Sequence, residues 1–140
     1  MFRIAADSQI IQSIARFSLK YVDLIPGGNL ETAGGLDIRV KLGELALDRQ
    51  NTVIRMEVAD PPFLHIVNAM TAAEAVQEGA APVRGSLIDV DTVHLSPQAS
   101  VQEFMDRLID NLDDAHARNK RMFFECLTPE TLDRLEPSYD

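Results

Sequence analysis

A long amphipathic pattern near the C-terminus constrains the fold of this chain more than any other feature. Ser100-Val101-Gln102-Glu103 matches a capping box, in which the Ser and Glu side chains satisfy free backbone amides at a helix start. Ser96-Pro97 offers an alternative start, with proline at the first helical position. At 100° per residue, apolar side chains share one face of this helix and charged side chains the opposite face. The apolar face consists of Val101, Phe104, Met105, Leu108, Ile109, Leu112, Ala115, Met122, Phe123, Cys126 and Leu127.

The segments on either side of this helix are also patterned. Thr128-Pro129 ends the long helix and begins a short final helix that runs to about Leu135. Before the long helix, residues 85–95 alternate in the way that is typical of a strand. We therefore expect a strand that leads directly into the covering helix.

Four further segments are expected to be strands. Alternation of apolar and polar residues predicts strands over 14–25, 36–42 and 52–59, and residues 42–47 fit a short helix equally well. Pro61-Pro62 ends the third of these segments. The nearly continuous apolar run over 63–70 is typical of a strand buried on both faces. Residues 71–83 are expected to form a loop with one helical turn. Residues 1–13 give no firm assignment, and residues 30–48 give none beyond the strand or short helix named above.

These elements predict an α+β fold. It is an antiparallel or mixed sheet of four to five strands, covered by a long C-terminal amphipathic helix and a short final helix. A chain of 140 residues without a linker or internal repeat fits one domain over 1–140. The sequence thus predicts a single sheet with helices on one face.

The net charge and the cysteine content limit the classes of partner and the cellular compartment that the sequence fits. The chain has 13 basic and 22 acidic residues, so its net charge is 13 − 22 = −9, which repels nucleic acid and anionic membrane surfaces. The single cysteine, Cys126, suits a reducing compartment. No leader pattern and no apolar stretch of bilayer length is present in the sequence. We expect a cytoplasmic protein without a nucleic-acid or membrane partner.

Asp89 and Asp91 are the weak candidates for catalysis or metal binding. Two residues apart on a strand, they share one face, where two carboxylates are able to hold Mg²⁺ or Mn²⁺ or to act as acid and base. The competing interpretation is a solvated strand face, or pairing with a basic side chain across the sheet, because Asp-x-Asp is a common pattern. His94 falls on the opposite face of a regular strand, which separates it from the pair.

Three polar residues lie within apolar patterns. His65, in an apolar strand, is more typical of a hydrogen-bonded core or interface residue than of a ligand. His116 lies at the edge of the apolar helix face and Asn119 at its centre. Both are candidates for an interface with another chain or for a polar device that sets packing register. No cofactor-binding motif is found in the sequence.

Three segments carry a resemblance. They are Arg16-Phe17-Ser18-Leu19-Lys20-Tyr21-Val22, the strand Gly85-Ser86-Leu87-Ile88-Asp89-Val90-Asp91-Thr92, and the terminal helix with His116 and Phe123 followed by Leu127-Thr128-Pro129-Glu130. Together they resemble the C-terminal half of a sporadically distributed prokaryotic family of uncharacterised, longer proteins, although Lys20 stands where that family has Arg. The resemblance implies no catalytic residues. It does imply that a sheet edge or apolar face covered in longer members is exposed here and favours self-association.

Two functions follow as hypotheses. The first is a non-enzymatic binding or regulatory module that forms a homo-oligomer or binds another protein. The alternative is a metal-dependent hydrolase or transferase that uses Asp89 and Asp91. Whether these two carboxylates line a pocket or face solvent distinguishes the two hypotheses.

Overall fold

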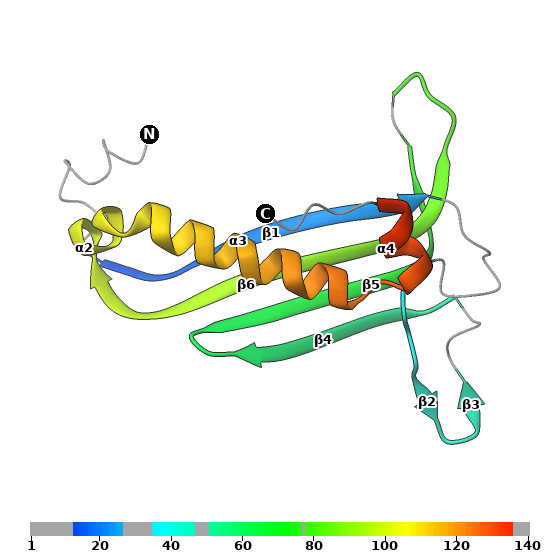
Figure 1. The fold of residues 1–140 in the computed structure, drawn as a ribbon, viewed down its shortest axis with the longest axis horizontal. Helices are drawn as coiled ribbons and strands as arrows, with labels where there is room; N and C mark the ends of the chain where they lie inside the picture. The colour runs from blue at the N-terminus through cyan, green and yellow to red at the C-terminus, as the bar shows by residue number, and fades with distance from the viewer. Residues whose placement is uncertain (1–12, 27–34, 47–50, 77, 136–140) are drawn as a thin grey trace.

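A four-stranded sheet with one long helix across one face is the main feature of the fold (Figure 1). The computed structural model describes residues 13–26, 35–46, 51–76 and 78–135. The strands are β1 (Ser13–Pro26), β4 (Val53–Asp60), β5 (Phe63–Ala75) and β6 (Val83–Ser100). Their order is β1-β6-β5-β4, and every neighbouring pair is antiparallel. The α+β prediction is confirmed, in its antiparallel form.

The hairpin of β4 and β5 forms where the sequence places two strands around a proline pair. β4 corresponds to the strand predicted over 52–59, and β5 begins directly after Pro61-Pro62, whose peptide bond is cis. Because proline lacks an N–H, this dipeptide ends the ladder. Asp60 and Phe63 pair at the closed end of the hairpin, so the turn fixes the position of the Asp60 carboxylate.

β5 and β6 are both longer than the sequence predicts. The expected loop over 71–83 is wrong at its start, because β5 passes through an irregularity between Met70 and Ala73 and continues to Ala75. β6 extends to Ser100, so a helix start at Ser96-Pro97 is wrong as well. Burial alternates along β5, with the odd-numbered side chains from Phe63 to Ala73 buried and the even-numbered ones at least partly exposed. The prediction of complete burial on both faces is therefore wrong on the face away from the helix.

The strand predicted over 36–42 does not join the main sheet. Leu36 forms an isolated antiparallel bridge with Leu127, and the small strands β2 (Lys41–Leu42) and β3 (Leu45–Ala46) pair only with each other. Gly43 adopts a positive φ of 61° in the turn between them, which excludes the short helix over the described residues 42–46. An alternating pattern identifies an extended segment, but it does not identify the strand with which that segment pairs. The remaining predictions for residues 1–12, 27–34 and 47–50 lie outside the described residues.

Three described helices follow β6: α2 (Val101–Asp106), α3 (Leu108–Glu125) and α4 (Pro129–Leu135). The capping box is confirmed, since Ser100 accepts from the Glu103 amide and Glu103 accepts from the Ser100 amide. Arg107, with φ −111°, interrupts the helix that the sequence predicts as continuous. α4 begins at Pro129 as predicted, and the Thr128 hydroxyl accepts from the Thr131 amide. No described helix combines the length and the apolar character that are needed to cross a bilayer.

The core lies between α3 and the sheet and continues to the C-terminal end of the helix. Burial of each large apolar side chain in such a layer stabilises the fold by roughly 1.5–3 kcal/mol. The helix contributes a narrower face than its apolar pattern predicts, because Ile109 is 70% exposed and Leu112 is also exposed. The central core cluster consists of Ile25, Leu36, Val67, Ala69, Ile88, Val90, Met122 and Leu127.

Candidate functional site

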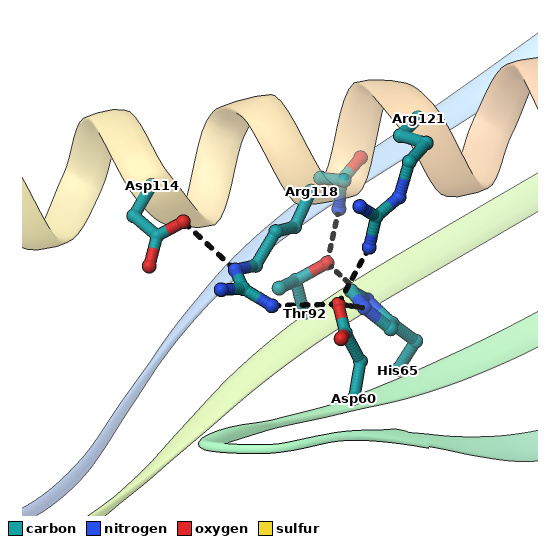
Figure 2. A network of polar contacts seen from close by, with 7 residues as sticks. Asp60, His65, Thr92, Asp114, Arg118 and Arg121 are labelled. Atoms are coloured by element: carbon teal, nitrogen blue, oxygen red, sulfur yellow. Dashed lines mark hydrogen bonds and ion pairs between the residues drawn. The ribbon is translucent and has the colours of Figure 1, made fainter.

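A network of polar side chains links α3 to the sheet near the tip of the β4–β5 hairpin (Figure 2). Asp60 ends β4, while His65 on β5 and Thr92 on β6 are directly paired across the ladder. Because α3 lies over these strands, its residues reach the same place from above. We call this set the polar network, and its members are Asp60, His65, Thr92, Asp114, Arg118, Asn119 and Arg121.

The buried half of the polar network is a chain of hydrogen bonds that runs from Asn119 to Asp60. The side-chain amide of Asn119 donates to Thr92 Oγ1 at 3.0 Å and to the Val90 carbonyl at 2.9 Å. The Asp60 carboxylate only accepts, so the 3.3 Å contact of His65 Nε2 with Asp60 Oδ2 is a hydrogen bond in which Nε2 donates. In the tautomer with the proton on Nε2 alone, Nδ1 accepts from the Thr92 hydroxyl, 2.9 Å away. The buried groups are thus linked from Asn119 through Thr92 and His65 to Asp60.

The outer half of the polar network is an ion cluster around a single carboxylate oxygen. Asp60 Oδ2 accepts from Arg118 Nη1 at 2.8 Å and from Arg121 Nη2 at 2.7 Å. Hydrogen bonds from Arg118 and then from His65 lower the pKa of Asp60 below its ordinary value. Arg118 also donates to Asp114 at 2.7 Å and lies over the Phe63 ring, 4.9 Å from its centre. The cluster thus fastens the hairpin tip to the helix.

The order carboxylate, imidazole and hydroxyl in Asp60, His65 and Thr92 is also the order of a hydrolytic triad. A nucleophile, however, has to meet its substrate, and both His65 and Thr92 are 0% exposed beneath α3. The Thr92 hydroxyl is in addition engaged by Asn119 as well as by His65. In this conformation the polar network holds the helix on the sheet. The interpretation of His65 as a hydrogen-bonded core histidine agrees with this placement.

His94 lies on the helix side of the sheet, within an aromatic cluster. Its ring stacks on Phe17 at 5.2 Å between centroids and forms a T-shaped contact with Phe63 at 4.7 Å. Phe104 of α2 also packs against Phe17, at 5.5 Å between centroids. Burial lowers the pKa of His94, which favours the neutral ring. Strand alternation correctly separates His94 from Asp89 and Asp91.

Asp89 and Asp91 lie on the face of the sheet opposite the helix. Asp89 Oδ2 forms an ion pair with Lys20 Nζ at 2.8 Å and accepts a hydrogen bond from the side-chain amide Nδ2 of Asn68 at 3.3 Å. The ion pair with Asp89 raises the pKa of Lys20. The other oxygen, Oδ1, of each aspartate is buried and has no hydrogen-bond partner among the described residues. Within the described ranges, no group of three or more His, Cys, Asp or Glu is arranged to hold a metal ion.

His116 and Asn119 occupy different environments, although the sequence grouped them. Asn119 is 1% exposed and faces the sheet, where it also donates to the Leu19 carbonyl at 3.2 Å. Its position agrees with the register device and not with a surface contact to another chain. His116 is exposed and lies 5.8 Å from the Tyr21 ring on the side of the helix toward β1.

Two apolar hollows lie beside the C-terminal half of α3. The larger, of about 630 Å³, lies between α3 and α4 and is lined by apolar atoms of Phe124, Leu127 and Leu132. The second, of about 240 Å³, lies between residues 36–40 and strands β4 and β5, and Cys126 lines it. Burial raises the pKa of the Cys126 thiol, so the thiol remains protonated and apolar. We call the larger hollow the α3–α4 groove.

No local sequence pattern distinguishes Asp60, Thr92 or Arg118. Each belongs to a residue type that is common on surfaces, and their meeting depends on the hairpin turn and on the position of the helix. One signal was present, since an Asn at the centre of an apolar helix face requires buried partners. That signal identifies the position but not the partners.

Comparison with known proteins identified no relative of this chain. No family model, no curated protein and no solved structure matches the chain. The resemblance to an uncharacterised prokaryotic family therefore stays a prediction.

Proposed function

We propose that this chain is a non-enzymatic binding or regulatory module that self-associates. The proposal is supported by the contrast between buried polar groups and exposed apolar side chains. His65 and Thr92, which have the chemistry for a reaction, are closed beneath α3, whereas apolar surface on α3 and in the α3–α4 groove is open. Exposed apolar surface that is rimmed by polar residues is typical of protein-binding sites. The function therefore belongs to the surface of the helix and not to the polar network.

The α3–α4 groove is the binding surface in this proposal. Its apolar walls face solvent beside Glu125 and Arg121, so apolar side chains of a protein partner would be buried while the charged rim stays hydrated. A net charge of −9 disfavours nucleic acid as the partner. The single Cys126 suits a reducing cytoplasm, which we propose as the location. The proposal requires no cofactor.

A hydrophobic fluorescent dye tests the groove directly. We expect the wild-type protein to enhance the fluorescence of anilinonaphthalene sulfonate and Leu132→Asp to reduce this enhancement at least about threefold, because the carboxylate stands in the groove wall. Leu42→Asp is the matched control, since Leu42 is exposed on β2, away from the groove. Equal signals from both variants, with circular dichroism showing both folded, would contradict the proposal.

Self-association is tested by light scattering after size exclusion. We expect a mass of twice the chain or more at micromolar concentration, because exposed apolar residues such as Ile109 and Leu112 gain from burial in an oligomer. The mass of a single chain over this concentration range would contradict the proposed self-association.

A metal-dependent hydrolase or transferase that uses Asp89 and Asp91 is the second candidate. It is favoured by the two buried Oδ1 atoms that lack partners among the described residues, and opposed by the ion pair of Asp89 with Lys20. A Mg²⁺ or Mn²⁺ site would make the melting temperature rise with metal concentration, and the variant Asp89→Asn/Asp91→Asn would lose this rise. An unchanged melting temperature in both metals excludes this candidate.

A further inference from the structure

We infer that a second copy of this chain pairs with the outer edge of β1, antiparallel, about a two-fold axis that passes beside Leu19. The inference rests on the proposed self-association and specifies its geometry. The two sheets would form one continuous eight-stranded sheet, since each copy contributes four strands. Both copies of α3 would lie on the same face, because a two-fold axis that relates antiparallel neighbours is perpendicular to the sheet.

The first support is the open edge itself. β1 is an outer strand of 14 residues, and within the described residues it pairs with β6 alone. A strand edge of this length is a template for further pairing unless charge or proline blocks it. The ammonium group of Lys20 points inward to Asp89 on β6, 2.8 Å away. Arg16 and Asp23 of β1 are exposed, and the register given below opposes neither of them to a like charge. Among the described residues, no second strand pairs with this edge.

The second support is a self-compatible register. Opposed residues of an antiparallel pair share a face, so the two-fold axis has to pass through one residue and not between two. An axis at Ser18 opposes Arg16 with Lys20, and an axis at Lys20 opposes Lys20 with itself. An axis at Tyr21 pairs residues 16–26 and also avoids directly opposed like charges. With the axis at Leu19, residues 13–25 face one another without directly opposed like charges, and the ladder irregularity of β1 between Ile14 and Arg16 lies near the end of the paired segment. The position of Asn119 over Leu19 favours the axis at Leu19.

The third support is the position of α3 above the sheet. Asn119 donates to the Leu19 carbonyl of β1 and to the Val90 carbonyl of β6, so here the helix passes over the gap between these strands. The proposed axis runs midway between the two β1 strands. The middle of the gap between β1 and β6 therefore lies one strand spacing, about 4.8 Å, from the axis. The two helices would therefore lie about 10 Å apart, which matches the 8–10 Å of directly packed helices. Strand pairing and helix packing are thus satisfied together.

The fourth support is the chemistry of the surface between the two helices. The contact of His116 with Tyr21 identifies the flank of α3 that faces β1. This flank carries Ile109, which is 70% exposed, and Leu112, at helical spacings of seven and four residues from His116. Tyr21 of β1 is also 43% exposed. The second copy would bury these apolar groups, whose exposure the single chain leaves unexplained.

A register-specific cross-link tests the geometry. In a Cys126→Ser background, one protein carries Ser18→Cys and another Lys20→Cys. With the axis at Leu19, residue 18 of one copy opposes residue 20 of the other, with Cα atoms about 4.5–5.5 Å apart, within the range of a disulfide. We expect mild oxidation to give a disulfide dimer in the mixture at a yield at least about fivefold above that of either protein alone. Like residues are diagonal neighbours about 7–8 Å apart, which is too far.

A second variant tests the dimer interface without a cross-link. Ile109→Asp should weaken the dimer at least about tenfold, which corresponds to about 1.4 kcal/mol, while circular dichroism stays native because the residue is exposed. Val53→Asp, at a residue that is 70% exposed on β4, the outer strand on the opposite side of the sheet, is the control and should leave the dimer unchanged.

The outcomes separate the two proposals. A wild-type monomer overturns self-association and this geometry together. A wild-type oligomer that gives no 18–20 cross-link, and that Ile109→Asp does not weaken, overturns the β1 pairing alone. Formation of the mixed disulfide together with selective weakening by Ile109→Asp supports the pairing.

Discussion

Asn119 shows how one polar side chain sets the position of a helix. Its amide lies beneath α3 and donates to two strands at once, through the carbonyls of Leu19 and Val90. A buried amide that loses such partners destabilises a fold by about 1–3 kcal/mol. Any sliding or rotation of α3 would break these bonds, whereas apolar contacts tolerate small shifts. The residue therefore selects one register among several of similar apolar burial.

Replacement of this amide by a carboxylate tests that role. We expect Asn119→Asp to lower the free energy of unfolding by about 3–5 kcal/mol at neutral pH, because a buried carboxylate faces carbonyl oxygens and cannot donate to them. Urea unfolding measures the loss. Asn111→Asp, on the same helix but only partly buried, should cost less than about 1 kcal/mol. Equal losses at the two positions would remove the special role of Asn119.

The ion cluster around Asp60 makes the stability of the fold depend on pH. Arg118 and then His65 hold the pKa of Asp60 below its ordinary value of 3.8. A carboxylate with a lowered pKa in the folded state contributes stability above its unfolded pKa and loses it as the pH falls through the folded pKa. The melting-temperature difference between wild type and Asp60→Asn should therefore be constant from about pH 7 to about pH 5 and shrink below about pH 4.

Thermal melts by circular dichroism at each pH measure this difference. Asp133→Asn, which removes a carboxylate at an exposed position on α4 outside the ion cluster, is the control and should change the melting temperature less than Asp60→Asn at pH 7. If the Asp60→Asn difference stays constant down to about pH 3, the ion cluster does not stabilise the folded state.

At the scale of elements, the close approach of β1 and β6 controls how the sheet is built. Gly85 lies at the start of β6, opposite Pro26 of β1 and Ala73 of β5. A Cβ atom at this position would overlap the carbonyl oxygen of Ile25, which belongs to the backbone and cannot rotate away. The strands reach this separation because the residue at position 85 has no side chain.

We expect Gly85→Ala to lower the free energy of unfolding by about 1–3 kcal/mol, because β1 has to move outward to admit the methyl group. Denaturant unfolding measures the total effect. Amide hydrogen exchange should show the largest loss of protection at the Ile25 end of β1 and little change at the Phe17 end. A variant as stable as the wild type would show that the strands have room at this point.

At the scale of the whole molecule, the two faces of the sheet have different chemistry. The helix face buries the core and the polar network, whereas the opposite face carries ion-paired groups such as Lys20 with Asp89 and Arg55 with Glu57. An exposed pair such as Arg55 with Glu57 contributes little to stability. The net charge of −9 acts over the whole surface and opposes the compact state.

Salt should therefore stabilise the molecule. Between about 10 mM and about 200 mM sodium chloride the Debye length falls below about 10 Å, so repulsion among the excess acidic groups is screened. We expect the melting temperature to rise over this range. Potassium chloride should give the same rise, which distinguishes screening from binding of sodium. A fall in the melting temperature would mean that attractive ion pairs outweigh the net repulsion.

The sequence determined the elements whose signals are local. Alternation predicts β1 and β4, Pro61-Pro62 marks the end of β4, and Ser100 with Glu103 marks the start of α2. These predictions hold because a strand face, a proline break and a helix cap each depend on residues within a few positions of one another. The same local alternation correctly places His94 on the face opposite Asp89 and Asp91.

Only the tertiary structure decided which side chains meet. His65 and Thr92 are 27 residues apart, and Asp60 and Arg118 are 58 residues apart. Their contacts depend on strand register and on the placement of α3, which local patterns do not encode. The exposure of Ile109 and the separation of residues 36–42 from the main sheet have the same cause. An apolar or alternating pattern shows that a residue has a face to bury, but the packed fold decides how much of that face is covered and by which element.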